Sequence, residues 1–194
     1  MLSGARDFAI ENDLLARARK QVQVPAAVTV HDTELGELIE EAAELVEYET
    51  AWILAGGTFN LDYDCWPAGE DPIEIHCRPV TAINSITYYD DDTAQRTFSA
   101  SLYRFDNGRV WPVIWRADFD VAWPSLASDR RGVVTVNFEA GASAASTIPT
   151  AARIAVLSRV ARLWNDRGYG DLGSDGFGNV FLSAVNQARS SGYL

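Results

Sequence analysis

The chain contains few of the side chains from which metal sites and disulfide frameworks are built. Its 194 residues include two histidines, two cysteines and a single lysine, Lys20. A structural zinc site needs four close Cys or His ligands, and His76, Cys77 and Cys65 do not supply them. We expect free thiols of a cytosolic protein, with a bridge between Cys65 and Cys77 as the alternative.

Motifs of common enzyme classes are also missing. No Gly-x-Ser-x-Gly, His-Glu-x-x-His or Walker A sequence occurs. Residues 168–173 match the dinucleotide fingerprint by letter, but they follow a helical pattern, whereas that fingerprint must follow a strand. With 27 acidic residues a carboxylate-based hydrolase stays open as an alternative, although nothing singles out a pair. We therefore predict no enzyme, no cofactor and no metal.

Positive charge is scarce where negative charge is dense. The net charge is −11, and residues 21–77 hold 13 Asp and Glu without any Lys or Arg. Proteins that grip nucleic acid need clustered cations to displace the counterions of phosphate, so tight DNA binding is disfavoured. A negative surface past which DNA slides remains compatible with this pattern. The apolar runs are shorter than the roughly 18–20 residues of a membrane span, and no membrane partner is expected.

Apolar residues at steps of three and four predict a helix over 33–55, ended by Gly56-Gly57. Its glutamates have two interpretations: a solvated face, or an acidic wall towards a channel or a basic partner. The channel interpretation also fits the acidic loop 62–71. The candidate channel residues on the helix are Glu37, Glu41, Glu44 and Glu47.

Over 72–139 the period changes from helical to alternating, with Asn107-Gly108 as a two-residue hairpin turn and residues 133–138 as the clearest strand. A second helix is predicted over 149–167, and it is apolar around most of its girth. Such a helix is central in a bundle or shared with a neighbouring subunit. The candidate interface residues are Val156, Val160 and Leu163. The fold class is thus α+β, a small helical bundle with an inserted antiparallel β-sheet.

Residues 168–194 are rich in glycine, with isolated apolar residues between. We predict an extended C-terminal arm that orders on a partner, with a frayed end of no function as the alternative. Residues 1–27 are predicted as an N-terminal helix and linker, and 28–167 as the main domain. The candidate docking residues of the arm are Tyr169, Leu172, Phe177, Phe181, Leu182 and Tyr193.

A resemblance rests on the order of short motifs between residues 28 and 167. After the acidic helix these are Trp66-Pro67, Ile73-Glu74-Ile75, Arg78-Pro79-Val80, Asp90-Asp91-Asp92, Trp123-Pro124, residues 134–141, Ile148-Pro149 and residues 153–157. In this order the chain resembles the head–tail connector (adaptor) proteins of tailed bacteriophages, a family also found in prophages and gene transfer agents.

The resemblance implies a non-enzymatic virion protein of the neck, assembled in the host cytoplasm. It implies a closed homo-oligomeric ring, typically a dodecamer, that docks under the portal protein, extends the DNA channel and presents a platform to the next neck or tail protein. Family members have no known catalytic residues, so none is carried over. Another neck or tail-completion protein is the alternative identity.

Overall fold

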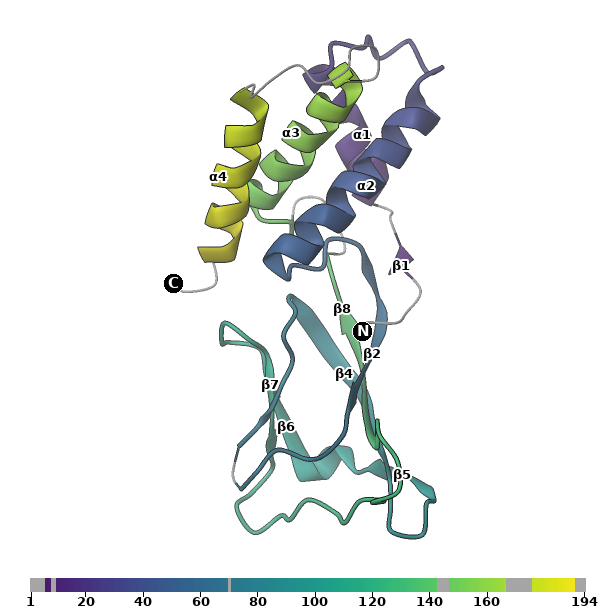
Figure 1. Ribbon diagram of the computed structural model, residues 1–194, viewed down its shortest axis with the longest axis vertical. Coiled ribbons are helices and arrows are strands. Elements are labelled where there is room, and N and C mark those ends of the chain that lie inside the picture. The colour runs from purple at the N-terminus through teal and green to yellow at the C-terminus, as the bar shows by residue number, and fades with distance from the viewer. Residues whose placement is uncertain (1–5, 8–9, 70, 143–146, 167–175, 191–194) are drawn as a thin grey trace. The chain divides into compact units, whose positions relative to one another are not determined.

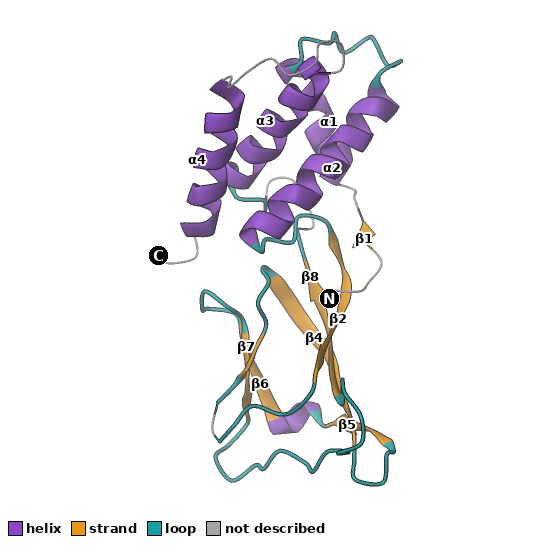
Figure 2. Cartoon of the chain, in the orientation of Figure 1, coloured by secondary structure: helices purple, strands orange, loops and turns teal. Residues whose placement is uncertain are grey.

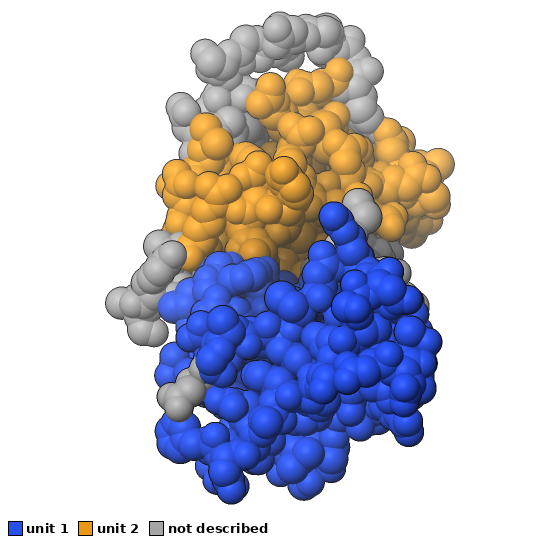
Figure 3. All heavy atoms as spheres, turned by 60° about the horizontal axis from the view of Figure 1, so that its bottom comes forward, with its two compact units in different colours: residues 1–6, 56–141 blue, residues 7–55, 142–194 orange. Residues whose placement is uncertain are grey.

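The computed structural model describes residues 6–7, 10–69, 71–142, 147–166 and 176–190. The chain divides into two compact units (Figure 3). We call Met1–Arg6 with Gly56–Gly141 the sheet unit, and Asp7–Ala55 with Ala142–Leu194 the helical unit. Helices and antiparallel sheets are thereby segregated, and the predicted α+β class is confirmed (Figure 2).

The helical unit contains four helices (Figure 1). They are α1 (Ile10–Gln21), α2 (Asp32–Thr50), α3 (Thr150–Asp166) and α4 (Gly176–Ser190). Helix α2 ends five residues before its predicted end, because Ala51 is left-handed (φ 56°) and its N–H donates to the Glu47 carbonyl oxygen at 2.8 Å. The glycine pair expected to end the helix instead begins strand β2 (Gly56–Tyr63).

The core of the helical unit is built from small and branched side chains on all four helices. Alanines let the helix backbones approach closely, and valine, leucine and isoleucine fill the space between them. Helix α3 packs against α2 and α4, and α1 packs against α2 and α3. The buried residues include Leu14, Ala18, Leu35, Ile39, Ala42, Val46, Ala152, Ala155, Val156, Val160, Ala184, Val185 and Ala188.

Helix α4 corrects the expectation of an extended arm. Residues 176–190 form a helix, and Ala184, Val185 and Ala188 are buried in the core. Their spacing of three and four residues places them on one face, which covers the apolar surface of α3. The glycine-rich composition of the segment predicts an extended arm. Packing of this apolar face outweighs the low helix propensity of glycine.

The sheet unit contains two antiparallel sheets. One has the strand order β1-β2-β8-β4-β5 and the other the order β3-β7-β6. The remaining elements are β1 (Arg6–Asp7), β3 (Ile73–Glu74), β4 (Val80–Tyr89), β5 (Gln95–Phe98), η1 (Ala100–Leu102), β6 (Tyr103–Asp106), β7 (Val113–Arg116) and β8 (Val134–Ala140). The β region therefore begins at residue 56, earlier than the predicted 72, and ends near the predicted 139.

Strand β8 is the centre of the larger sheet and alternates buried and partly exposed residues. Phe138 lies opposite Phe59 of β2 and Ile83 of β4 in the register. The connection between β6 and β7 spans residues 107–112, longer than the predicted two-residue turn. Pro112 has no N–H to donate, and the return strand begins after it.

Trp66 and Trp123 stack with ring centroids 4.6 Å apart, which ties the loop before β3 to the irregular segment before β8. The Trp66 indole N–H also donates to the Pro124 carbonyl oxygen at 2.9 Å. Across the described residues, no helix combines the length and apolar character needed to cross a membrane.

Candidate functional site

Helix α2 carries an exposed acidic stripe, which we define as Glu37, Glu40, Glu41 and Glu44. Their spacing of three and four residues puts them on one face, and all four are exposed. Within the described part of the chain, Glu41 is the one member with an ion pair, to Arg159 of α3 at 3.4 Å. Tyr48, one turn beyond Glu44, continues the stripe and is 86% exposed. Charge and an uncovered aromatic ring thus share one helix face.

Glu47 does not belong to this face, which corrects its assignment as a channel residue. It is only 7% exposed. Its carboxylate accepts hydrogen bonds from the backbone N–H groups of Leu54 at 2.7 Å and Ala55 at 3.1 Å. Those amides follow the end of α2, where a buried donor needs an acceptor. Glu47 therefore holds the segment that leads from α2 into β2.

The three candidate interface residues of α3 are also placed differently from the prediction. Val156 and Val160 are fully buried within the helical unit, and Leu163 is partly buried. Helix α4 packs against α3, and both belong to one core shared by the four helices, so burial of these valines requires no neighbouring subunit. A helix that is apolar around most of its girth lies either at the centre of a bundle or at a subunit interface. The burial of Val156 and Val160 corresponds to the central position in a bundle.

The candidate docking residues of the C-terminal segment fall into three groups. Tyr169, Leu172 and Tyr193 lie outside the described residues, and of Phe177 only the backbone, in α4, is described. Phe181 is partly buried and packs against the helical core. Leu182 points to solvent and is 60% exposed. Of the two candidates whose side chains the structure describes, Leu182 has the exposure that a docking residue requires.

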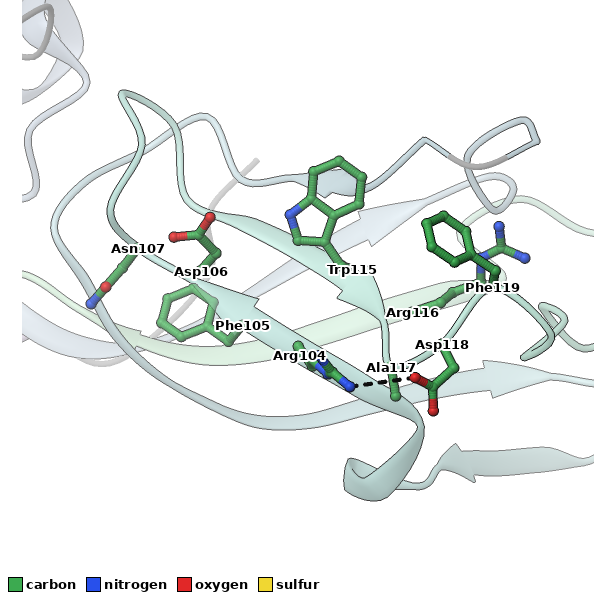
Figure 4. Close-up of a pocket in the computed structure, with 9 residues that line it drawn as sticks. All are labelled: Arg104, Phe105, Asp106, Asn107, Trp115, Arg116, Ala117, Asp118 and Phe119. Atoms are coloured by element: carbon green, nitrogen blue, oxygen red, sulfur yellow. Dashed lines mark hydrogen bonds and ion pairs between the residues drawn. The ribbon is translucent and has the colours of Figure 1, made fainter.

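A pocket that the sequence did not indicate lies against the β6–β7 hairpin (Figure 4). Residues 104–107 and 115–119 line its volume of about 620 Å³. Strand pairing joins the two segments, because Arg104 lies opposite Trp115 in the register. Figure 4 shows Phe105 and Trp115 on the paired strands and Phe119 on the loop after β7. Phe119 is 85% exposed, which is unusual for a large aromatic ring.

The charges of the pocket are unevenly matched. Arg104 pairs with Asp118 at 3.4 Å, and Arg109, outside the pocket, pairs with Asp106 at 3.4 Å. The Arg109 guanidinium also lies 5.2 Å from the centroid of the Trp115 ring. Arg116 donates to the Val121 carbonyl oxygen at 2.8 Å and has no ion-pair partner among the described residues. One guanidinium of the pocket therefore lacks a carboxylate.

The remaining acidic clusters stabilise turns. The Asp90 carboxylate accepts hydrogen bonds from the Arg96 side chain at 2.7 Å and from the Ala94 N–H at 2.9 Å. The Arg96 hydrogen bond is the main cause that lowers the pKa of Asp90. Asp62 accepts from the Thr135 hydroxyl at 2.6 Å, and Asp64 from the Gly132 N–H at 2.7 Å. No His, Cys, Asp and Glu cluster suited to a metal occurs in the described residues.

The two cysteines are free thiols in different surroundings. Cys65 is exposed and Cys77 is buried. Burial raises the pKa of the Cys77 thiol to about 12. Because the thiolate is the nucleophile, we expect iodoacetamide at pH 8 to modify Cys65 in the folded protein and to leave Cys77 unmodified. Peptide mass spectrometry checks this, with unfolded protein as the control. Equal labelling of both residues would contradict the burial of Cys77.

Comparison with known proteins gives structural matches only. No protein-family model matches the chain, and no curated protein matches it. One solved structure, "Virion of native gene transfer agent (GTA) particle", has a similar chain at 21% identity and TM-score 0.75, over 97% of this chain and 95% of that one.

Two further similar chains come from structures of such particles. "Neck of empty GTA particle computed with C6 symmetry" matches at 22% identity and TM-score 0.76, over 97% and 95% of the two chains. "Neck of native GTA particle computed with C12 symmetry" matches at 22% identity and TM-score 0.72, over 97% and 94%. At these identities the likeness shows a shared fold, and it extends over both units.

Proposed function

We propose that this chain is a non-enzymatic structural subunit of the neck of a phage-like particle. The observation that carries the proposal is the fold shared over 97% of the chain with chains in structures of the necks of gene transfer agent particles. The order of motifs between residues 28 and 167 supports the proposal independently, because the resemblance to the connector family lies in the sequence alone. Within the neck, we propose the role of a head–tail connector between the portal and the next neck or tail protein.

The proposed assembly is a closed ring of copies of this chain, most simply twelve. The two neck structures that contain a similar chain were computed with C6 and C12 symmetry. Twelve equivalent subunits satisfy both, since a twelvefold axis contains a sixfold one. The buried positions of Val156 and Val160 mean that the contacts between copies use other surfaces than the apolar stripe of α3.

The DNA path is proposed to be bordered by exposed carboxylates. Glu37 and Glu41 on α2 qualify, as do Asp62 near the end of β2 and Asp64 just after it, since all four are exposed. Like charge discourages DNA from staying on a surface that it must pass. Glu47 is removed from this set because its carboxylate is buried against backbone amides.

Co-purification tests the connector role. The portal protein encoded beside this chain, co-expressed with it, should be retained when this chain carries the affinity tag. A tail-completion protein would instead retain a tail component and leave the portal in the flow-through. Retention of neither component would remove the connector assignment and leave only the shared fold.

For the docking surface we predict that Leu182→Asp weakens portal retention by roughly tenfold or more, because a charge replaces an exposed apolar anchor. Val30→Asp is the matched control, since Val30 is 79% exposed and lies in the loop between α1 and α2. Thermal melts should show both variants folded. Equal retention of the two variants would move the docking surface away from α4.

A further inference from the structure

The connection between β6 and β7 contains the one Asn-Gly sequence of the chain, Asn107-Gly108. The sequence predicts a two-residue hairpin turn at this dipeptide, whereas the structure forms a longer irregular connection over 107–112. Both residues are exposed there, at the end of the hairpin beside Asp106 (Figure 4). The dipeptide therefore closes no tight turn, and its own chemistry is open to solvent.

An asparagine followed by glycine loses ammonia without an enzyme. The backbone nitrogen of the glycine attacks Cγ of the asparagine, so that a new N–Cγ bond closes a five-membered succinimide ring and the Cγ–Nδ2 bond breaks. Nδ2 leaves as ammonia together with the proton of the attacking nitrogen. Water then opens the ring at either carbonyl group and gives aspartate or isoaspartate. Glycine favours the attack, because it has no Cβ and its backbone reaches angles that other residues avoid.

The surroundings of Asn107 leave it able to react. Within the described part of the chain, its side-chain amide has no hydrogen bond, so Cγ is free to turn towards the nitrogen of Gly108. Both residues lie outside the strands, so strand pairing does not fix the backbone between them.

Asn84 provides an internal comparison. Ser85 is the smallest residue, apart from Gly108, that follows an asparagine in this chain, which makes Asn84-Ser85 the next candidate by sequence. Asn84 is exposed like Asn107, but it lies in β4, and its Nδ2 donates to Oδ1 of Asn137 at 2.9 Å. Strand and hydrogen bond together hold this amide away from the following backbone nitrogen.

Asp106 acts against the reaction at Asn107. Its Oδ1 accepts a hydrogen bond from the Gly108 N–H at 2.9 Å, and the nitrogen must lose that proton when it attacks. A carboxylate at this distance also opposes the negative charge that the attacking nitrogen gains. We propose that Asn107 is a site of spontaneous deamidation whose rate Asp106 holds down. The product adds one negative charge to the lining of the pocket, next to the ion pair of Asp106 and Arg109. This proposal is independent of the neck assignment.

Peptide mass spectrometry of the full chain, incubated at pH 8 and 37 °C with and without urea, tests the site. Folded Asn107 should keep roughly a tenth or more of its rate in urea, whereas folded Asn84 should lose a far larger share of its own. Gly108→Ala should slow Asn107 roughly tenfold. The added Cβ lies 3.3 Å from Oδ1 of Asp106, a side chain that is free to shift, so this variant is expected to fold. Folded protein in which Asn107 stays intact while urea converts it overturns the site.

Asp106→Ala tests the restraint in the same assay. Loss of the carboxylate should speed the conversion of folded Asn107 about threefold or more and leave the rate in urea nearly unchanged. Circular dichroism should show the variant folded, because it removes an exposed ion pair. An equal or slower folded rate in Asp106→Ala overturns the restraint.

A folded-to-urea rate ratio for Asn84 as high as that for Asn107 would show that the local structure does not select the site.

Discussion

Removal of residues 168–194 is expected to unfold the helical unit, because the deletion takes away helix α4. Ala184, Val185 and Ala188 would leave the core, and the surface of α3 that packs against α4 would meet water. Loss of this apolar burial costs on the order of 5 kcal/mol, which is comparable with the whole stability of a small domain. Circular dichroism during thermal unfolding measures the effect.

Two substitutions on α4 separate this packing from any partner contact. Val185→Asp places a charge in the core and should lower the free energy of unfolding by roughly 3 kcal/mol or more. Leu182→Asp, on the exposed face of the same helix, should stay within about 0.5 kcal/mol of the wild type. A truncated chain that melts like the wild type would show that α4 contributes no packing and would restore the extended arm.

Replacement of Glu47 by alanine is expected to destabilise the helical unit more than the same replacement of any exposed glutamate on α2. The backbone N–H groups of Leu54 and Ala55 would lose their shared acceptor in a buried position. An unpaired buried donor costs about 1–3 kcal/mol, so two cost roughly 2–6 kcal/mol together. Urea unfolding monitored by tryptophan fluorescence gives the difference in free energy.

Glu44→Ala is the matched control for Glu47→Ala, since it removes the same carboxylate from an exposed position three residues earlier. Its expected effect is within about 0.5 kcal/mol. Glu47→Gln should fall between the two, because an amide oxygen still accepts a hydrogen bond. Equal stability of the two alanine variants would mean that the Glu47 carboxylate does not hold the end of the helix.

The regular elements were the most predictable part of the fold. Apolar steps of three and four residues located α2 and α3, and the β-branched run from Val133 located β8, because these patterns reflect burial directly. Helix α4 has the same kind of pattern at Phe181, Ala184, Val185 and Ala188. The glycine-rich composition upstream of the helix obscures this spacing. Packing of the apolar face against α3 nevertheless makes the segment helical.

The candidate site was less predictable, for two physical reasons. Glu47 lies only about 20° around the helix from the exposed Glu40 at about 100° per residue, so the helical pattern places it at the edge of the acidic stripe. Whether such a residue is exposed depends on what packs there, and here backbone amides after α2 do. The pocket depends on the register that places Arg104 opposite Trp115. A two-residue turn at Asn107-Gly108 would place Arg104 opposite Trp111 instead, so the turn signal gives the wrong register.

The most direct test of the proposed neck subunit is a cryo-electron microscopy reconstruction, without imposed symmetry, of particles purified from cells that produce this chain with a small tag. The account predicts twelve tagged copies in a closed ring at the neck, each with α4 packed on α3. Tagged density elsewhere in the particle, or a single copy on the axis, would contradict the account.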